Sequence, residues 1–116
     1  IDVPAEFEQA KDFGFATMLS NLLENAFIAV CKVPDSQERK VSVRIEPKKE
    51  QLIIEIRNNY FGKLDISRET GLPVTDKVDG HGYGLVSVSN YARKSGALLK
   101  FRPEGQLLIV QYITNL

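Results

Sequence analysis

The sequence predicts an α+β fold, a two-layer α/β sandwich in which helices cover one face of a mixed, mostly antiparallel sheet. Two stretches have the apolar spacing of helices, and each is followed by a pair of strand-like segments with alternating apolar and polar residues. The order is helix, hairpin, long loop, helix, hairpin, without an internal repeat. Because each helix has one apolar face to bury and each hairpin pairs antiparallel strands, two packed layers are expected.

The first helix is expected from about Phe7 to Val33, and Pro34 follows its end. Apolar residues within it recur at the i, i+3, i+4 spacing that forms one buried stripe on a helix. The residues of this stripe are Leu19, Leu22, Leu23, Ala26 and Val30.

The first hairpin is expected in Val41–Glu46 and Leu52–Ile56, where β-branched residues alternate with polar ones, with a turn at Pro47–Glu50. The next segment, from Asn58 to Asp79, has no sustained periodicity. Loops of this length in a small domain are usually functional or mobile.

The second helix is expected from about Gly84 to Lys94, with Gly96 ending it in a left-handed conformation. Two further strands follow, Ala97–Arg102 and Leu107–Thr114, with a turn at Gly105. The buried residues of the second helix are expected to be Leu85, Val88 and Ala92.

Composition indicates one globular domain that spans residues 1–116, since 116 residues with 43% hydrophobic content can build a single core. The opening Ile1–Pro4 resembles the end of a strand and no methionine precedes it, so we expect a piece of a longer protein. The lone cysteine, Cys31, lies in an apolar helical stretch and is expected to be a buried thiol, in keeping with a reducing cytoplasm.

Charge and hydropathy exclude two classes of partner. Fifteen basic residues balance fifteen acidic ones, so no positive field favours nucleic acid. Uninterrupted apolar runs such as Leu107–Val110 are far too short to span a bilayer, so we expect no direct membrane contact by this domain.

Two asparagines, Asn21 and Asn25, lie one turn apart on the first predicted helix and therefore share a face. Asparagine is a poor helix former, so a pair in an otherwise strong helix points to a role beyond solvation, although two solvated amides remain the alternative. Amide oxygens are suitable neutral ligands for magnesium.

A glycine-dense loop, Gly80–Leu85, runs directly into the second predicted helix. Glycines permit close approach of the backbone, and the free N–H groups of a helix start favour phosphate. The loop is neither a dinucleotide fingerprint, which needs a later glycine at Leu85, nor a phosphate-binding Walker loop. A flexible loop capped by glycines is the alternative.

Together these residues resemble the GHKL superfamily, which groups gyrase-type topoisomerases, a heat-shock chaperone, histidine kinases and mismatch-repair ATPases on the Bergerat fold. Asn21–Ala26 is similar to its helical asparagine box, and Gly80–Leu85 to its second glycine box. More narrowly, Asn58–Gly62, Gly71–Lys77 and His81–Leu85 resemble the catalytic domain of peptide-pheromone-sensing sensor histidine kinases of Gram-positive bacteria.

The resemblance implies that magnesium and ATP bind between the asparagine helix and the second glycine box, under a lid formed by residues of about 59–79. Asn25 would bind magnesium with the assistance of Asn21. The nucleotide-binding residues that it implies are Asn21, Asn25, Ala29, Asn58, Lys77, Gly80, His81, Gly82, Tyr83, Gly84 and Leu85.

Two positions depart from the superfamily pattern. Asn58 stands where most members have an aspartate that reads the exocyclic amine of adenine, and its amide oxygen can accept the same hydrogen bond more weakly. Ile28 stands where the subgroup often has a carboxylate and other histidine kinases have a lysine. One contact on the phosphate side of the nucleotide is therefore left without an assigned residue. Lys77 is a candidate charge partner for phosphate, with a solvated lysine as the alternative.

His81 is the only histidine of the chain, but it lies inside the glycine box. We expect it to line the nucleotide site rather than to accept phosphate, because the family's acceptor lies on a separate helical hairpin; a solvated histidine is the alternative. Glu24 is expected to be a solvated carboxylate rather than a general base, because it points about a quarter-turn away from Asn25.

The function implied is transfer of the terminal phosphoryl group of ATP to a histidine on a separate dimerisation domain, with a response regulator downstream, in two-component signalling. The domain would then be the cytoplasmic part of a membrane-bound receptor kinase, inactive without its acceptor. Three alternatives stay open: a GHKL ATPase, an anti-sigma serine kinase and a degenerate module that only binds protein or nucleotide. The ATPase reading is weakened because Asn21 occupies the position of its catalytic glutamate.

Overall fold

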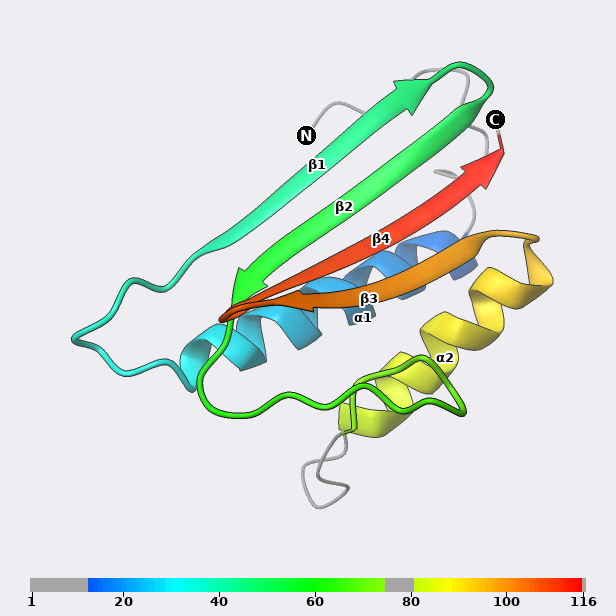
Figure 1. Ribbon diagram of the computed structural model, residues 1–116. Coiled ribbons are helices and arrows are strands. Elements are labelled where there is room, and N and C mark those ends of the chain that lie inside the picture. The colour runs from blue at the N-terminus through cyan, green and yellow to red at the C-terminus, as the bar shows by residue number, and fades with distance from the viewer. Residues whose placement is uncertain (1–12, 75–80, 116) are drawn as a thin grey trace.

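The computed structural model describes residues 13–74 and 81–115, and within them the elements follow the predicted order (Figure 1). The strands are longer than predicted at several ends, so that β1 continues through Pro47 and the turn narrows to Lys49 and Glu50. The elements are α1 (Phe13–Cys31), β1 (Val41–Lys48), β2 (Gln51–Asn59), α2 (His81–Lys94), β3 (Leu98–Glu104) and β4 (Leu107–Asn115).

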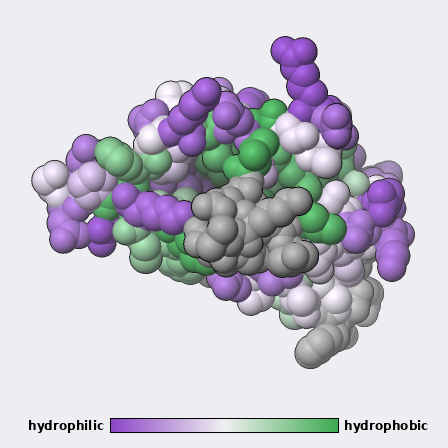
Figure 2. All heavy atoms as spheres, turned by 90° about the horizontal axis from the view of Figure 1, so that it is seen from below, coloured by the Kyte–Doolittle hydropathy of each residue, from purple (hydrophilic) through white to green (hydrophobic). Residues whose placement is uncertain are grey.

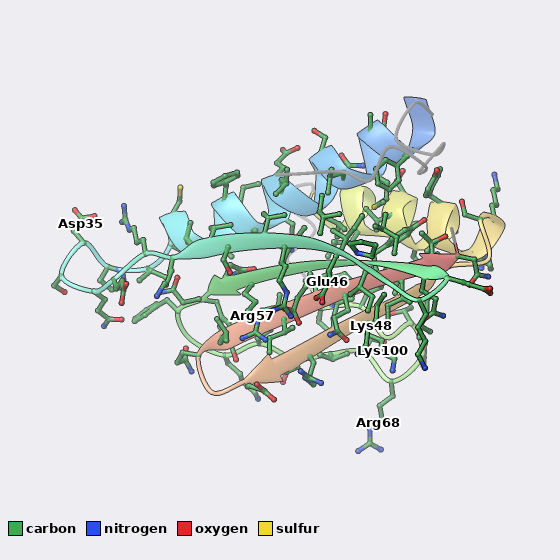
Figure 3. The ribbon with its side chains drawn as sticks, turned by 90° about the horizontal axis from the view of Figure 1, so that it is seen from above. Asp35, Glu46, Lys48, Arg57, Arg68 and Lys100 are labelled. Atoms are coloured by element: carbon green, nitrogen blue, oxygen red, sulfur yellow. The ribbon has the colours of Figure 1, made fainter. Side chains whose placement is uncertain are left out.

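The four strands form one sheet with the order β1-β2-β4-β3, and every neighbouring pair is antiparallel. Both helices lie on the same face of this sheet (Figures 1 and 3). The predicted two-layer α+β sandwich is therefore confirmed, and the sheet is antiparallel throughout its described strands. In this order β2 and β4 are central, with β1 and β3 at the edges.

The core lies between the sheet and the helices, and the two central strands supply much of it. Alternate residues of β2 and β4 point to the helices, as expected for a sheet with one buried face. The predicted inward residues of α2 are also buried. The innermost side chains of these elements are Leu52, Ile54 and Ile56 of β2, Leu108, Val110 and Tyr112 of β4, and Leu85, Val88 and Ala92 of α2.

The buried stripe of α1 differs from the predicted one by a rotation of the helix. Leu22, Ala26 and Val30 are buried as expected, but Leu19 and Leu23 are only partly buried. Phe15 and Met18 complete the stripe in their place, with Phe15 making an edge-to-face contact with Tyr112. The apolar spacing is compatible with either of two neighbouring stripes. The bulky side chains of Phe15 and Met18 determine which of the two is buried.

The rotation of α1 also overturns the prediction for Cys31, which is exposed. Cys31 lies half a turn from the stripe, on the outward side of the helix, with Leu23 and Phe27 along the same groove of about 780 Å³. By length and mean hydropathy alone, Gly14–Cys31 could cross a membrane (mean hydropathy 1.3), although its uninterrupted apolar runs are short. In the structure its inner side packs on the sheet, so α1 is a core helix with a second apolar side.

The face of the sheet away from the helices carries charged side chains such as Glu46 and Arg57 (Figure 3), and one carboxylate is buried among them. Glu55 of β2 is 5% exposed, and it accepts hydrogen bonds from Arg44, Arg57 and Gln111, each at 3.2 Å. Burial tends to raise the pKa of Glu55, but the hydrogen bonds from Arg57 and Gln111 and the charges of both arginines outweigh it and hold that pKa below its usual value.

Truncation of the buried leucine of α1 should destabilise the domain far more than truncation of its neighbour. We expect Leu22→Ala to lower the free energy of unfolding by about 2–5 kcal/mol, because it leaves a cavity in the core. Leu23→Ala removes a side chain that still contacts solvent, so its cost should be clearly smaller. Urea denaturation of both variants measures this, and equal losses would contradict the rotated stripe.

Neutralising Glu55 should cost stability in a pH-dependent way. The folded-state pKa of Glu55 is lowered, so its contribution is fully present above its unfolded value of about 4.3 and is lost as the pH falls through the folded value. We expect Glu55→Gln to lower the free energy of unfolding by about 1–3 kcal/mol at pH 7 and by less at pH 3. The matched control, Glu46→Gln, changes an exposed carboxylate 3.7 Å from Arg44 and should have little effect at either pH.

Candidate functional site

The two asparagines of α1 lie beside the buried stripe, on the side of the helix opposite to Leu23. Asn25 lies about 60° around the helix axis from Leu22, on the side opposite to Leu23. Both Asn21 and Asn25 are half-buried, unlike the exposed Glu24 of the same turn. The pair therefore borders the buried stripe and is partly screened from solvent.

The part of the glycine box from His81 onward belongs to the first turns of α2 rather than to a loop before it. We expected the helix to begin near Gly84, but it begins at His81. Gly82, Tyr83 and Gly84 therefore lie in the turn whose backbone N–H groups have no partner within the helix. The first turn contains no acidic side chain that would compete for these groups. The N–H groups and the helix dipole thus provide a site for a phosphate oxygen.

Asn58 ends the inward face of β2 as a polar residue in the core. It is 1% exposed, and its Nδ2 donates a hydrogen bond to the Asn59 carbonyl at 3.1 Å. Its Oδ1 is buried and has no hydrogen-bond partner among the described residues. An unpaired buried acceptor costs about 1–3 kcal/mol, and proteins rarely retain one without a reason. A ligand with an N–H donor, such as the exocyclic amine of adenine, would satisfy it.

The described part of the predicted lid is folded onto the domain. Asn59 belongs to β2, and the segment 60–74 is pinned by a bridge between Ile66 and Pro73 and by packing of Leu64 and Leu72 against the core. Gly71 has a φ of 71°, which lets this small hairpin close through its N–H to the Ser67 carbonyl at 2.8 Å. Figure 2, which views this side of the molecule, shows apolar surface between the charged side chains.

The remaining predicted residues fall into three groups. Ala29 is half-buried on α1, whereas Leu85 is 2% exposed and belongs to the core, so its part in the site is limited to the backbone. Ile28 lines the outward groove of α1. Lys77 and Gly80 lie outside the described residues, and the side chains of His81–Gly84 are likewise not described.

Sequence reasoning missed one neighbour of the site. Asn59 was seen only as part of a motif, yet its side chain accepts a hydrogen bond from the Lys40 N–H at 2.8 Å and donates one to the Glu38 carbonyl. No pattern in the sequence pairs residues 38–40 with residue 59. The pairing follows from the register in which Val41 lies opposite Asn58, so only the fold reveals it.

The chain belongs to the GHKL domain family, whose family model matches residues 11–114. The match covers both the asparagine flank of α1 and the first turn of α2. GHKL domains bind ATP, usually with magnesium, and the family includes histidine kinases and other ATPases. No curated protein matches the chain at a significant level.

The described residues fit a magnesium nucleotide on chemical grounds. Asn21 and Asn25 offer neutral oxygen ligands, which suit a hard ion that keeps water and phosphate as its other partners. The first turn of α2 offers backbone donors for phosphate. The unpaired Oδ1 of Asn58, near the C-terminal end of β2, offers a hydrogen-bond acceptor for the nucleotide base.

Replacement of Asn58 by leucine should separate binding from stability. Leucine has a similar volume and removes the unpaired oxygen, so we expect Asn58→Leu to unfold at the same urea concentration as the parent chain or a higher one. The same change should abolish the contact with the base and weaken ADP binding at least tenfold, which is about 1.4 kcal/mol. Parallel denaturation and calorimetric titration test this, and a large loss of stability would show that the amide is structural.

Proposed function

We propose that the chain is the catalytic ATP-binding domain of a sensor histidine kinase, which donates the terminal phosphoryl group of ATP to a histidine on a separate dimerisation domain. Membership of the GHKL family supports the ATP site. The observation that carries the choice of a kinase over an ATPase is the half-buried amide at Asn21, in the position where the resemblance implies a water-activating glutamate for ATPases. An amide cannot act as that base.

The other carboxylate of this turn does not replace the missing base. Glu24 is exposed, and it lines the outward groove of α1 together with Phe27. Glu24 lies about 100° around the helix axis from Asn25, so its carboxylate does not share the side of the helix on which Asn25 lies. The described residues of this face include no carboxylate placed to activate water. The side chains therefore favour slow hydrolysis of ATP and transfer of the phosphoryl group to an external acceptor.

The residues of the chain then have separate parts in the transfer. Bound magnesium would supply charge neutralisation at the transferring phosphate. Asn25, with Asn21, would hold the ion, the first turn of α2 would hold phosphate oxygens, and Asn58 would hold the base. This division leaves the chain to bind and orient ATP, while the nucleophile comes from another domain.

The wider assignment follows from the same resemblance. The three segments that resemble peptide-pheromone-sensing kinases favour two-component signalling, with a response regulator as the next phosphate acceptor and a membrane-bound receptor as the complete protein. The acceptor histidine would lie outside this chain, and His81 would not receive phosphate. A degenerate module that binds only protein is the second candidate, which the departures at Asn58 and Ile28 favour.

Nucleotide binding tests the proposal first. Magnesium with ADP at a hundredfold excess over its dissociation constant should add about 2.7 kcal/mol to the free energy of unfolding. Asn25→Ala should weaken binding in magnesium but not in chelator, because it removes an ion ligand. Glu24→Ala removes an exposed side chain about a quarter-turn around the helix from Asn25; it is the matched control and should leave both affinities unchanged. Absence of any stabilisation by millimolar nucleotide would favour the degenerate module.

Transfer tests the finer assignment. The chain alone should hydrolyse radiolabelled ATP slowly and acquire no acid-labile label, and a histidine-bearing helical hairpin from its own full-length protein should become labelled when it is added in trans. The transfer is expected to be weak, since the tether that raises the effective concentration is missing. Rapid hydrolysis without the hairpin would favour the ATPase, and label on His81 would refute its exclusion as acceptor.

A further inference from the structure

The hydrogen bond between Asn58 and its neighbour determines which atom of the Asn58 amide remains for a ligand. The Nδ2 group donates to the Asn59 carbonyl at 3.1 Å, and the Oδ1 atom is left unpaired in the core. If the amide were turned over, its oxygen would face the carbonyl oxygen, and two acceptors would meet without a hydrogen between them. The carbonyl of Asn59 therefore fixes Oδ1 as the atom of the amide that is left without a partner among the described residues.

The peptide group that carries this carbonyl is held on the other side by the turn between β3 and β4. The N–H of Tyr60 donates to the Gln106 carbonyl at 3.0 Å, and the Tyr60 hydroxyl donates to the Gly105 carbonyl at 2.7 Å. The N–H and C=O of a trans peptide point in opposite directions. The bond to Gln106 therefore turns the Asn59 carbonyl away from that turn and toward the Asn58 amide.

The side chain of Asn59 holds the same peptide from the side of β1. Its Oδ1 accepts the Lys40 N–H at 2.8 Å, its Nδ2 donates to the Glu38 carbonyl, and its backbone N–H donates to the Lys40 carbonyl at 3.2 Å. These three bonds extend the β1–β2 pairing by one residue beyond Asn58. Asn59 thus ties the end of β2 to the segment that leads from α1 into β1.

We infer that Asn59 is a positioning residue that makes Asn58 select adenine over guanine nucleotides, an inference that rests on the nucleotide site proposed above. Adenine carries an amine donor at position 6, whereas guanine carries an oxygen acceptor there. A fixed Oδ1 accepts a hydrogen bond from the first and repels the second. An amide that is free to turn over can serve both, since it has a donor and an acceptor of similar shape.

This mechanism is specific to an amide. A carboxylate presents two equivalent oxygens, so its orientation does not alter which base it accepts. Selection of adenine by Asn58 needs the hydrogen bonds that hold Asn59 in place. Selection by an aspartate at position 58 does not need them. The two residues are therefore expected to be coupled, and the coupling should vanish when position 58 is a carboxylate.

A calorimetric comparison of ADP and GDP, both with magnesium, tests the inference in four proteins: the unmodified chain, Asn59→Ala, Asn58→Asp and the double variant. The unmodified chain should prefer ADP. Asn59→Ala should reduce the ratio of ADP to GDP affinity about tenfold, which corresponds to the net free energy of about one hydrogen bond. Asn58→Asp should keep a high ratio, and adding Asn59→Ala to it should leave that ratio unchanged.

Controls separate positioning from general damage. Asn115→Ala changes an exposed asparagine at the other end of the sheet and should not alter the ratio. Asn59→Asp keeps the acceptor for the Lys40 N–H but sets a carboxylate oxygen against the Glu38 carbonyl, so the ratio should fall in this variant too, and it serves if the alanine variant fails to fold.

Four outcomes are decisive. An unchanged ratio in Asn59→Ala, or an equal fall of the ratio with aspartate at position 58, would overturn the inference while leaving the nucleotide site intact. Absence of ADP binding by the unmodified chain would instead refute the proposed function. If Asn59→Ala lowers the ratio only where position 58 is an asparagine, the inference is supported. A general loss of structure would lower the ratio with either residue at position 58.

Discussion

The antiparallel pairing of β2 with β4 is the constraint on which the rest of the molecule depends. Its inward residues are among the least exposed of the described chain, with Leu52 and Tyr112 both at 0%. The register places Asn58 opposite Leu108, at the end of this apolar row. Because side chains alternate along a strand, the register that buries the leucines also buries the amide. A polar ligand-binding group thus enters the core as a consequence of the same pairing that stabilises it.

The outer face of β2 fixes the same register from the opposite side. Glu55 lies three residues before Asn58 and therefore on the other face, where Arg44, Arg57 and Gln111 surround it. A slip of one residue would place the carboxylate among the inward leucines without partners and would expose the amide. β2 thus carries the carboxylate of Glu55 on its outer face and the amide of Asn58 on its inner face. Both groups are accommodated only in the observed register.

Much of this could be predicted from local patterns, and what could not be predicted depends on contacts. Apolar spacing and strand alternation were sufficient for the order of elements and for the inward residues of α2, such as Val88. They were insufficient for α1, where Leu23 and Leu22 fit the periodicity equally well until Phe15 and Met18 are seen to pack on the sheet. The exposure of Cys31 follows from that rotation, so one ambiguity produced two errors.

The site shows the same limit. Asn21, Asn25 and Asn58 were found by spacing and resemblance, and the structure adds that the oxygen of Asn58 is unpaired. The start of α2 was placed three residues late, because glycines suggest a loop although their backbone can also be helical. The pairing of Asn59 with residues 38–40 links positions about twenty residues apart, and only strand register brings them together.

The two edge strands of the described sheet each contain a proline, Pro47 in β1 and Pro103 in β3. Proline has no N–H to donate, so a ladder of hydrogen bonds along the outer side of either strand is interrupted at that residue. Charged neighbours at Lys48 and Glu104 add a further barrier to stacking of one sheet against the edge of another. A crowded solution of this domain should accordingly resist strand-mediated aggregation, even though neither described helix covers the second face of its sheet.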